Sequence, residues 1–186
     1  MSDPGLHADA LRLLRGWTAP DPAQETLRRC YVRHLERRPD AMLRTCFPEH
    51  LTASSLIMSA DGDWVLLTLH AKANAWFQTG GHCEAADLTL AEAALREARE
   101  ESGVGDLALD PDPVHLDRHE VGFCDPRGPV HHLDVRFLVV AGPDVVPAIS
   151  TESLDVRWWP VDALPSTEAS LVDLVRRSRA RLAAVS

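Results

Sequence analysis

The run Leu95-Arg96-Glu97-Ala98-Arg99-Glu100-Glu101-Ser102-Gly103-Val104 combines a helical pattern with an unusual placement of charge. Three and four residues after Glu97 the chain returns to the same face of a helix, so Glu97, Glu100 and Glu101 crowd together. Three carboxylates at this spacing repel one another, and a helix built for stability alone would interleave basic residues. A divalent cation relieves this repulsion, and Mg²⁺ accepts a few carboxylates while it shares its other positions with water and phosphate. The alternative is a solvated acidic face on which the neighbouring arginines pair locally.

Apolar runs and turn signals around this helix predict a sheet. Residues 51–59 and 64–70 flank Asp61-Gly62-Asp63, and Asp-Gly between apolar runs is a strong hairpin signal. The second of these runs is apolar on both faces, so we expect it to be a central strand. The pair Gly80-Gly81 precedes an Ala-, Leu- and Glu-rich helix over 90–102, which ends at a glycine. Further strands are expected over 114–123, 132–141 and 156–160, and a closing amphipathic helix over 168–184.

The first 48 residues are expected to form a helical extension. Apolar residues recur at three- and four-residue spacing over 9–17 and 21–37, and Asp21-Pro22 supplies a cap and a first-turn proline for the second helix. We therefore expect an extension over 1–48 and a main domain over 49–186. The fold class is α/β, with a mixed sheet between helical layers.

Composition and charge exclude several classes of function. The chain has 186 residues with 45% hydrophobic and 25% charged side chains, which are ordinary values for a globular domain with a small appendage. Nineteen Lys and Arg against 28 Asp and Glu give a net charge of −9, so neither nucleic acid nor an anionic membrane is an expected partner. The N-terminus lacks the basic start and apolar run of a signal peptide, and no window reaches the ~20 apolar residues of a membrane span. We therefore expect a cytoplasmic protein.

The four cysteines, Cys30, Cys46, Cys83 and Cys124, are scattered without a C-x-x-C pair. This spacing argues against a zinc knuckle or a redox motif. It is typical of buried free thiols in a reducing compartment.

A segment that includes the acidic run resembles the signature of the Nudix hydrolase family. That signature runs Gly, five residues, Glu, seven residues, Arg-Glu, an aliphatic residue, any residue, Glu-Glu, any residue, Gly and an aliphatic residue. Gly80-Gly81-His82-Cys83-Glu84 resembles its glycine-rich start, and residues 96–104 match its second half with an alanine as the aliphatic residue. Asp87 stands where the family has Glu, and eight residues instead of seven separate it from Arg96, so the loop before the helix is one residue longer. We call residues 81–104 the Nudix box.

The resemblance implies an α/β/α sandwich and hydrolysis of a diphosphate bond in a nucleoside diphosphate joined to another group. Glu97, Glu100 and Glu101 would hold Mg²⁺ or Mn²⁺, with the carbonyl of Gly81 as a further ligand because a glycine lets the backbone approach closely. The metal would neutralise diphosphate oxygens and lower the pKa of a bound water that attacks phosphorus. The group that accepts the proton stays open between Glu100 or Glu101 and Glu152, which lies just before the last strand, where many relatives carry a catalytic acidic loop. A solvated loop carboxylate is the alternative for Glu152.

Four residues of the Nudix box are assigned structural roles. Arg96 is expected to bond a carboxylate of the box and fix the loop onto the helix, and Glu84 to do the same, with direct substrate contact as the alternative for both. Gly103 is expected to end the helix, and Asp87 to belong to the loop that Arg96 holds.

A polar strand face and several aromatic residues are candidate substrate contacts. His132, Asp134 and Arg136 alternate with apolar residues, and by the resemblance their face would adjoin the helix of the box. Arg136 would then bind a phosphate oxygen and His132 or Asp134 a sugar or base, although a solvent-facing polar strand fits the pattern equally well. Aromatic candidates for stacking on a base, with core packing as the alternative, are Trp76, Phe123 and Trp158.

The competing hypothesis is a catalytically weak Nudix-like module that binds or senses a nucleotide metabolite. The three retained glutamates argue against it, and the changed position of Asp87 argues for it. An interaction role for residues 1–48 is compatible with either hypothesis, and a homodimer stays open. Nucleotide sugars, dinucleoside polyphosphates, oxidised nucleoside triphosphates and ADP-ribose all present the same diphosphate, so the sequence does not select among these substrates.

Overall fold

The two apolar runs around Asp61-Gly62-Asp63 form the expected hairpin. The computed structural model describes residues 4–71, 73–122, 124–142, 145–149 and 153–185. In it, β1 (Glu49–Ser59) pairs antiparallel with β2 (Trp64–His70). Gly62 in the turn has a φ of 75°, a left-handed conformation that favours glycine because it has no Cβ.

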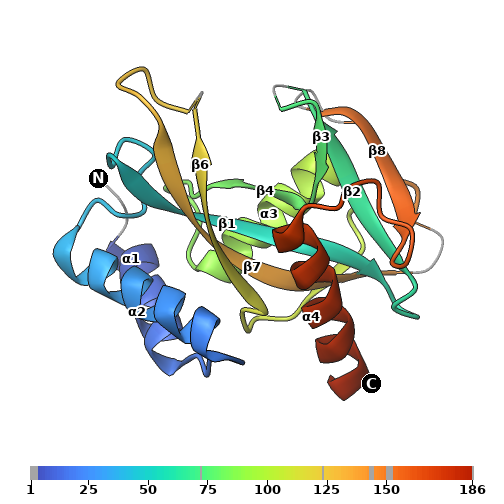
Figure 1. Cartoon of the computed structure of the whole chain (residues 1–186), viewed down its shortest axis with the longest axis horizontal. Coiled ribbons are helices and arrows are strands. Elements are labelled where there is room, and N and C mark those ends of the chain that lie inside the picture. The colour runs from blue at the N-terminus through green and yellow to red at the C-terminus, as the bar shows by residue number, and fades with distance from the viewer. Residues whose placement is uncertain (1–3, 72, 123, 143–144, 150–152, 186) are drawn as a thin grey trace.

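The strands form one mixed, curled sheet (Figure 1). The sheet has the order β3-β2-β1-β7-β5, while β4 also pairs with β1, β6 with β7 and β8 with β2. The pairing of β1 with β7 is parallel, from Glu49 opposite His131 to Ser59 opposite Ala141, and the other pairings are antiparallel. The remaining strands are β3 (Ala75–Phe77), β4 (Thr79–His82), β5 (Leu107–Leu109), β6 (His115–Val121), β7 (Val130–Ala141) and β8 (Ser153–Pro160).

Helices cover both faces of this sheet, as Figure 1 shows for α3 (Leu90–Ser102) and α4 (Ala169–Val185). Alanines on α3 pack in hydrophobic clusters with β7 residues such as Val135 and Val139. Leu171 and Leu174 of α4 pack on Leu138 from the opposite face of the same strand. The expected α/β sandwich with a mixed sheet is confirmed.

Two N-terminal helices, α1 (Pro4–Gly16) and α2 (Pro22–Arg37), lie at one end of the sheet (Figure 1). The Asp21 side chain caps α2 by accepting a hydrogen bond from the Gln24 amide at 2.9 Å, as the Asp21-Pro22 signal predicts. Leu14 on α1 and Tyr31 on α2 are fully buried in the hydrophobic cluster that also contains α3 and β7 residues. The two helices therefore share a core with residues beyond position 48, while the proposed domain boundary there stays a prediction.

The residue ranges of three short strands, β3, β4 and β5, were not predicted from the sequence. They have only three or four residues each, and β4 contains Gly80-Gly81, which lowers strand propensity. These segments are strands because they pair with longer strands; β4, for example, pairs with residues 52–55 of β1.

Within the described ranges, none of the helices combines the length and the apolar character that a membrane crossing requires.

Candidate active site

The glycine-rich start of the Nudix box lies against the glutamates of α3. Gly81 is paired with Ala53 of β1, and a Cβ added to Gly81 would lie 2.7 Å from the Oε1 atom of Glu97. The amide of Gly80 donates a hydrogen bond to Oε2 of Glu101 at 3.2 Å. The absence of a side chain at Gly81 therefore lets this backbone approach two of the three predicted metal ligands.

Arg96 holds the loop of the box onto α3. Its Nε and one Nη atom donate to both oxygens of Asp87, at 2.9 and 3.0 Å, and the same Nη donates to the carbonyl oxygen of His82 at 3.0 Å. Hydrogen bonding to Asp87 raises the pKa of the Arg96 guanidinium, so the arginine stays charged. Asp87 also accepts from the amide of Glu84 at 2.7 Å. An aspartate in a loop longer by one residue thus makes a bidentate contact with the arginine of the box.

The Glu84 side chain contributes less to this arrangement. Its carboxylate is 3.9 Å from Arg96 and its side chain is 63% exposed, whereas the side chain of Asp87 is 5% exposed. A contact this long and exposed stabilises little.

Two of the three glutamates, Glu97 and Glu100, share one end of the Arg96 guanidinium. One Nη atom of Arg96 lies 2.9 Å from Oε1 of Glu97 and 3.1 Å from Oε2 of Glu100. The Glu100 side chain is 58% exposed and that of Glu97 is 14% exposed, while Glu101 is buried. Carboxylate oxygens beside a closely approaching backbone are the donors that a hard divalent cation prefers, so the residues present fit Mg²⁺ or Mn²⁺.

The end of α3 is tied to the segment that leads to β8. Gly103 caps the helix in the left-handed region, with a φ of 68° and its amide bonded to the carbonyl of Arg99, as its predicted role requires. The amide of Ala148 donates to the carbonyl of Ser102 at 2.7 Å, and a Cβ on Gly103 would lie 2.7 Å from the Cβ of Ala148. Ala148 therefore contacts the C-terminal end of the box helix. Glu152, which follows Ala148 in the chain, lies outside the described residues.

The polar face of β7 does not adjoin the box helix, and that expectation is wrong. Leu133, Val135 and Phe137 pack in the cluster with the alanines of α3, so the alternate residues point to the opposite face of the sheet. The apolar face is the one buried under α3, because it can pack against the small side chains of that helix.

On the opposite face, Arg136 is buried among polar partners. It donates to Asp134 at 2.7 Å and to Asp117 at 2.9 Å, and it contacts Ser170 of α4. Burial of Asp134 opposes ionisation, but the charges of Arg136 and His119, together with hydrogen bonds from Arg136 and Ser54, outweigh burial and lower the pKa of Asp134. Thr52 and Ser54 of β1 donate to the same carboxylate.

The aromatic candidates are distributed over both faces of the sheet. Trp76 stands edge-on to Trp159, with ring centroids 5.2 Å apart, and packs against the cluster under α4. Trp158 packs against the cluster that contains α3 residues. Phe123 lies outside the described residues.

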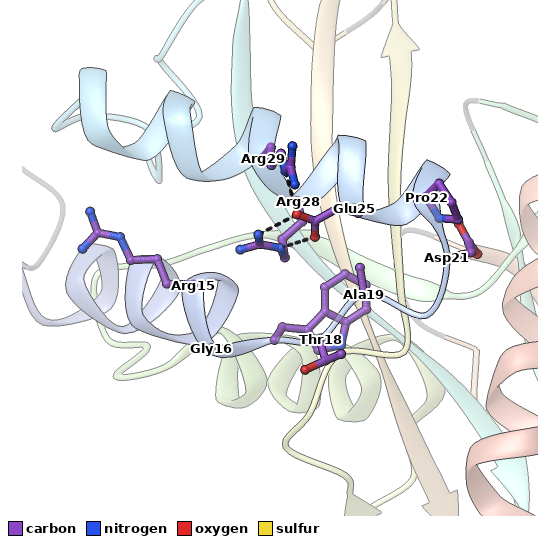
Figure 2. A pocket seen from close by; sticks show the side chains of 10 residues that line it. Arg15, Gly16, Thr18, Ala19, Asp21, Pro22, Glu25, Arg28 and Arg29 are labelled. Atoms are coloured by element: carbon purple, nitrogen blue, oxygen red, sulfur yellow. Dashed lines mark hydrogen bonds and ion pairs between the residues drawn. The ribbon is translucent and has the colours of Figure 1, made fainter.

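A hollow of about 690 Å³ lies elsewhere, where the end of α1 meets the start of α2 (Figure 2). Glu25 projects into it and accepts hydrogen bonds from Arg28 and Arg29, which lower the pKa of Glu25 to about 2. The arginines of this hollow are thus partly neutralised, and its lining includes no residue of the Nudix box.

One residue that supports the site was missed in the sequence. Asp9 of α1 is buried and accepts a hydrogen bond from the amide of Leu90, the first residue of α3, at 3.0 Å. Since 81 positions separate the two residues, no local pattern could indicate the contact.

Comparisons with known proteins agree with this architecture. A family model described as the NUDIX domain matches residues 48–178, while no curated protein matches the chain. The structure of a C. elegans Ap4A hydrolase binary complex is 20% identical with a TM-score of 0.58, and the match covers 72% of this chain and 98% of that one. The E. coli dihydroneopterin triphosphate pyrophosphohydrolase is 18% identical with a TM-score of 0.58, over 70% of this chain and 95% of that one.

A third similar structure is the NUDIX domain of Shewanella oneidensis NrtR complexed with ADP ribose. It is 18% identical with a TM-score of 0.51, and the match covers 81% of this chain and 97% of that one. At such identities the structural likeness shows the fold, and the family model carries the assignment because it spans more than half of the sequence. The resemblance found in the sequence is confirmed, and the chain belongs to the Nudix hydrolase family.

Proposed function

We propose that the chain hydrolyses a diphosphate linkage in a nucleoside diphosphate derivative, with Mg²⁺ or Mn²⁺ as cofactor. The observation that carries the proposal is that Glu97 and Glu101 lie against the backbone of Gly81 and Gly80, while Glu100 shares the Arg96 guanidinium with Glu97. Because these carboxylates repel one another, a site that keeps them together favours a cation among them.

The residues of the Nudix box have different roles in this proposal. A bound metal would neutralise diphosphate oxygens and lower the pKa of the attacking water. Glu97 and Glu101 would hold it from the helix, with the Gly81 carbonyl as a further ligand, while the exposed Glu100 would complete the ligand set or accept a proton. Arg96 would act as a positioning residue, because it bonds Glu97, Glu100 and the loop at once.

Glu152 is our candidate for the general base. A carboxylate that coordinates a metal is held ionised and is a poorer base than one placed nearby. The described residue Ala148, four positions earlier in the chain, donates a hydrogen bond to Ser102 at the end of α3, and this contact motivates testing Glu152. Glu100 and Glu101 are the alternative bases.

Substrate recognition is a separate proposal. Arg136, His132, Asp134 and Trp76 remain the candidate contacts for phosphate, sugar and base. Arg136 and Asp134 are buried and bonded to each other, so their replacement is expected to affect stability as well as KM. The names of the similar structures mention Ap4A, dihydroneopterin triphosphate and ADP ribose. These three compounds are therefore the first substrates to test.

Kinetics of glutamate variants test this function. Glu100→Gln and Glu101→Gln should each lower kcat by roughly 10²-fold or more on the substrate that a Mg²⁺-containing panel identifies, because a metal-bound charge is removed. Glu152→Gln should lower kcat by about 10²- to 10⁴-fold with metal affinity unchanged. Glu92→Gln is the matched control, since Glu92 is exposed in the first turn of the same helix. Near wild-type turnover by both Glu100→Gln and Glu101→Gln would contradict the metal assignment.

The alternative function is binding of a nucleotide metabolite without turnover. The changed position of Asp87 in the Nudix box favoured this alternative. Because Asp87 makes a bidentate contact with Arg96, that support is weakened. Saturable binding of a compound such as ADP-ribose, with no hydrolysis in Mg²⁺ or Mn²⁺, would support the alternative. A cytoplasmic location and a homodimeric state stay predictions.

A further inference from the structure

Three histidines and a cysteine meet on the face of the sheet opposite α3. His50 on β1 lies beside His132 on β7 in the parallel register, and His82 on β4 is opposite Thr52, two positions further along β1. Cys124 lies between β6 and β7. One ligand atom from each of these four residues lies within 4.8 Å of every other. We call the four residues the His/Cys cluster.

The spacing of the His/Cys cluster is close to that of a tetrahedral metal site. The Nε2 atoms of His82 and His50 are 3.1 Å apart, and the Sγ atom of Cys124 is 3.4 Å from Nε2 of His82. Around a zinc ion with Zn–N of about 2.0–2.1 Å and Zn–S of about 2.3 Å, neighbouring ligand atoms are about 3.3–3.6 Å apart. Small side-chain rotations would therefore bring the four atoms onto one ion.

The ring orientations also fit metal binding. The Nδ1 atom of His50 is 3.1 Å from the carbonyl oxygen of Cys46, so it donates there and leaves the lone pair of Nε2 directed at the cluster. Nε2 of His132 is buried, and no described residue gives it a hydrogen-bond partner. A buried polar atom without a partner is unfavourable, and a metal bond would satisfy it.

The loop that carries Cys124 is fastened to the connector before β1. Arg44 donates to the carbonyl oxygen of Cys124 at 3.3 Å, and Arg127 donates to the carbonyl oxygen of Thr45 at 2.9 Å. These contacts lie outside the ligand shell and hold the thiol beside the histidines, the kind of support that metal ligands receive from their surroundings.

We propose that His50, His82, His132 and Cys124 bind one Zn²⁺ ion in a closed, structural site. Three imidazole nitrogens and one thiolate suit zinc, whereas Mg²⁺ and Ca²⁺ require oxygen ligands. Four protein ligands leave no position open for water or substrate, which is characteristic of structural zinc. The site is distinct from the carboxylate site of the Nudix box, because the two lie on opposite faces of the sheet. In this proposal His132 is a metal ligand and does not contact the sugar or base.

Zinc at this site would act on the Nudix box through His82. The His82 side chain belongs to the His/Cys cluster, while its carbonyl oxygen accepts a hydrogen bond from Arg96 and its chain neighbour is Gly81. A zinc ion would therefore join β4 to β1 and β7 immediately beside the backbone that approaches Glu97. This consequence rests on the proposed function, but the binding of zinc does not.

Zinc content and cobalt spectroscopy of the full chain, produced without a histidine tag, test the site. We expect one zinc per chain after zinc exposure and gel filtration, and a thiolate-to-cobalt charge-transfer band with tetrahedral visible bands when Co²⁺ is added to the metal-free protein. Cys124→Ser should abolish the charge-transfer band. Cys124→Ser and His132→Ala should each weaken zinc affinity at least about 100-fold in competition with a chromophoric chelator.

Matched controls separate this site from surface binding and from the proposed function. His131→Ala removes the histidine next to His132 in β7, which lies near Glu120 instead, and Cys30→Ser removes a thiol on α2. Both variants should keep wild-type zinc affinity, and so should Glu100→Gln even when its hydrolysis is lost. Far-UV circular dichroism checks that each variant is folded. Zinc content near zero in the wild-type chain, or zinc binding unchanged in folded Cys124→Ser and His132→Ala, would overturn the proposal.

Discussion

Gly81 leaves no room for a side chain between β4 and the box helix. A Cβ there would lie within 2.8 Å of all three carboxyl atoms of Glu97, and Gly81 itself pairs with Ala53 of a buried strand. Either the carboxylate or the strand would have to move. At the residue scale, the position of the Glu97 carboxylate thus depends on the absence of a side chain at Gly81.

Gly81→Ala should therefore lower kcat by about 10²-fold, because a displacement of about 1 Å at a catalytic group has an effect of this size. Gly105→Ala is the control, since a Cβ at Gly105 meets no atom within 4 Å. Both variants should be assayed for turnover and thermal unfolding. Wild-type turnover by Gly81→Ala would show that the backbone of Gly81 need not approach Glu97 closely.

The sequence predicted the glutamate cluster and the capping role of Gly103, because helical spacing and cap signals are local. It predicted the alternation of β7 but assigned the wrong face to the box helix, since that choice depends on which face α3 covers. The His/Cys cluster was not predicted, because its ligands come from four separate segments that only the sheet register brings together. The absence of C-x-x-C excluded a local zinc motif and carried no information about such a site.

Two side chains accept hydrogen bonds from backbone amides at the N-terminus of the box helix. Thr89 Oγ1 accepts from the amide of Glu92 at 3.1 Å, and Asp9 of α1 accepts from the amide of Leu90. The first amides of a helix have no partner within it, and a carboxylate there also interacts favourably with the helix dipole. At the scale of elements, α1 thus completes the cap of α3.

Asp9→Ala should lower the free energy of unfolding by about 1–2 kcal/mol, since a buried helix amide loses its acceptor. The loss of the ion pair with Arg12 adds little, because the Arg12 side chain is 75% exposed. Urea unfolding measures the change, and Asp162→Ala in an exposed loop serves as control. An unfolding free energy within 0.5 kcal/mol of wild type, the range of ordinary surface substitutions, would show that water replaces Asp9 as the acceptor.

Element boundaries were predicted where the chain carries its own signals. The helix over 90–102 and the hairpin around Gly62 agree with the structure, because cap and turn residues mark them. The short strands β3 and β5 have three residues each and no such signal, and their pairing with β2 and β7 defines them. Tertiary contacts, rather than intrinsic propensity, account for these differences.

At the scale of the molecule, α2 covers an edge of the sheet. The Gln24 side chain donates to the carbonyl oxygen of Leu116 at 2.9 Å and accepts from its amide at 2.7 Å. Tyr31 donates to the carbonyl oxygen of Asp117 at 2.6 Å. These bonds replace those that a further strand would make to β6, and covered edges resist pairing with other chains.

We therefore expect the N-terminal helices and the Nudix domain to unfold together. Gln24→Ala removes both partners of Leu116 and should lower the free energy of unfolding by roughly 2–4 kcal/mol. Thr26→Ala, which removes an exposed hydroxyl of the same helix, is the control. If the helices form one cooperative unit with the sheet, amides of α2 and of β7 should exchange hydrogen with the same opening free energy, and Gln24→Ala should lower both values equally. Exchange of α2 at a clearly lower free energy than β7, with β7 unaffected by Gln24→Ala, would instead establish residues 1–48 as a separately folding extension.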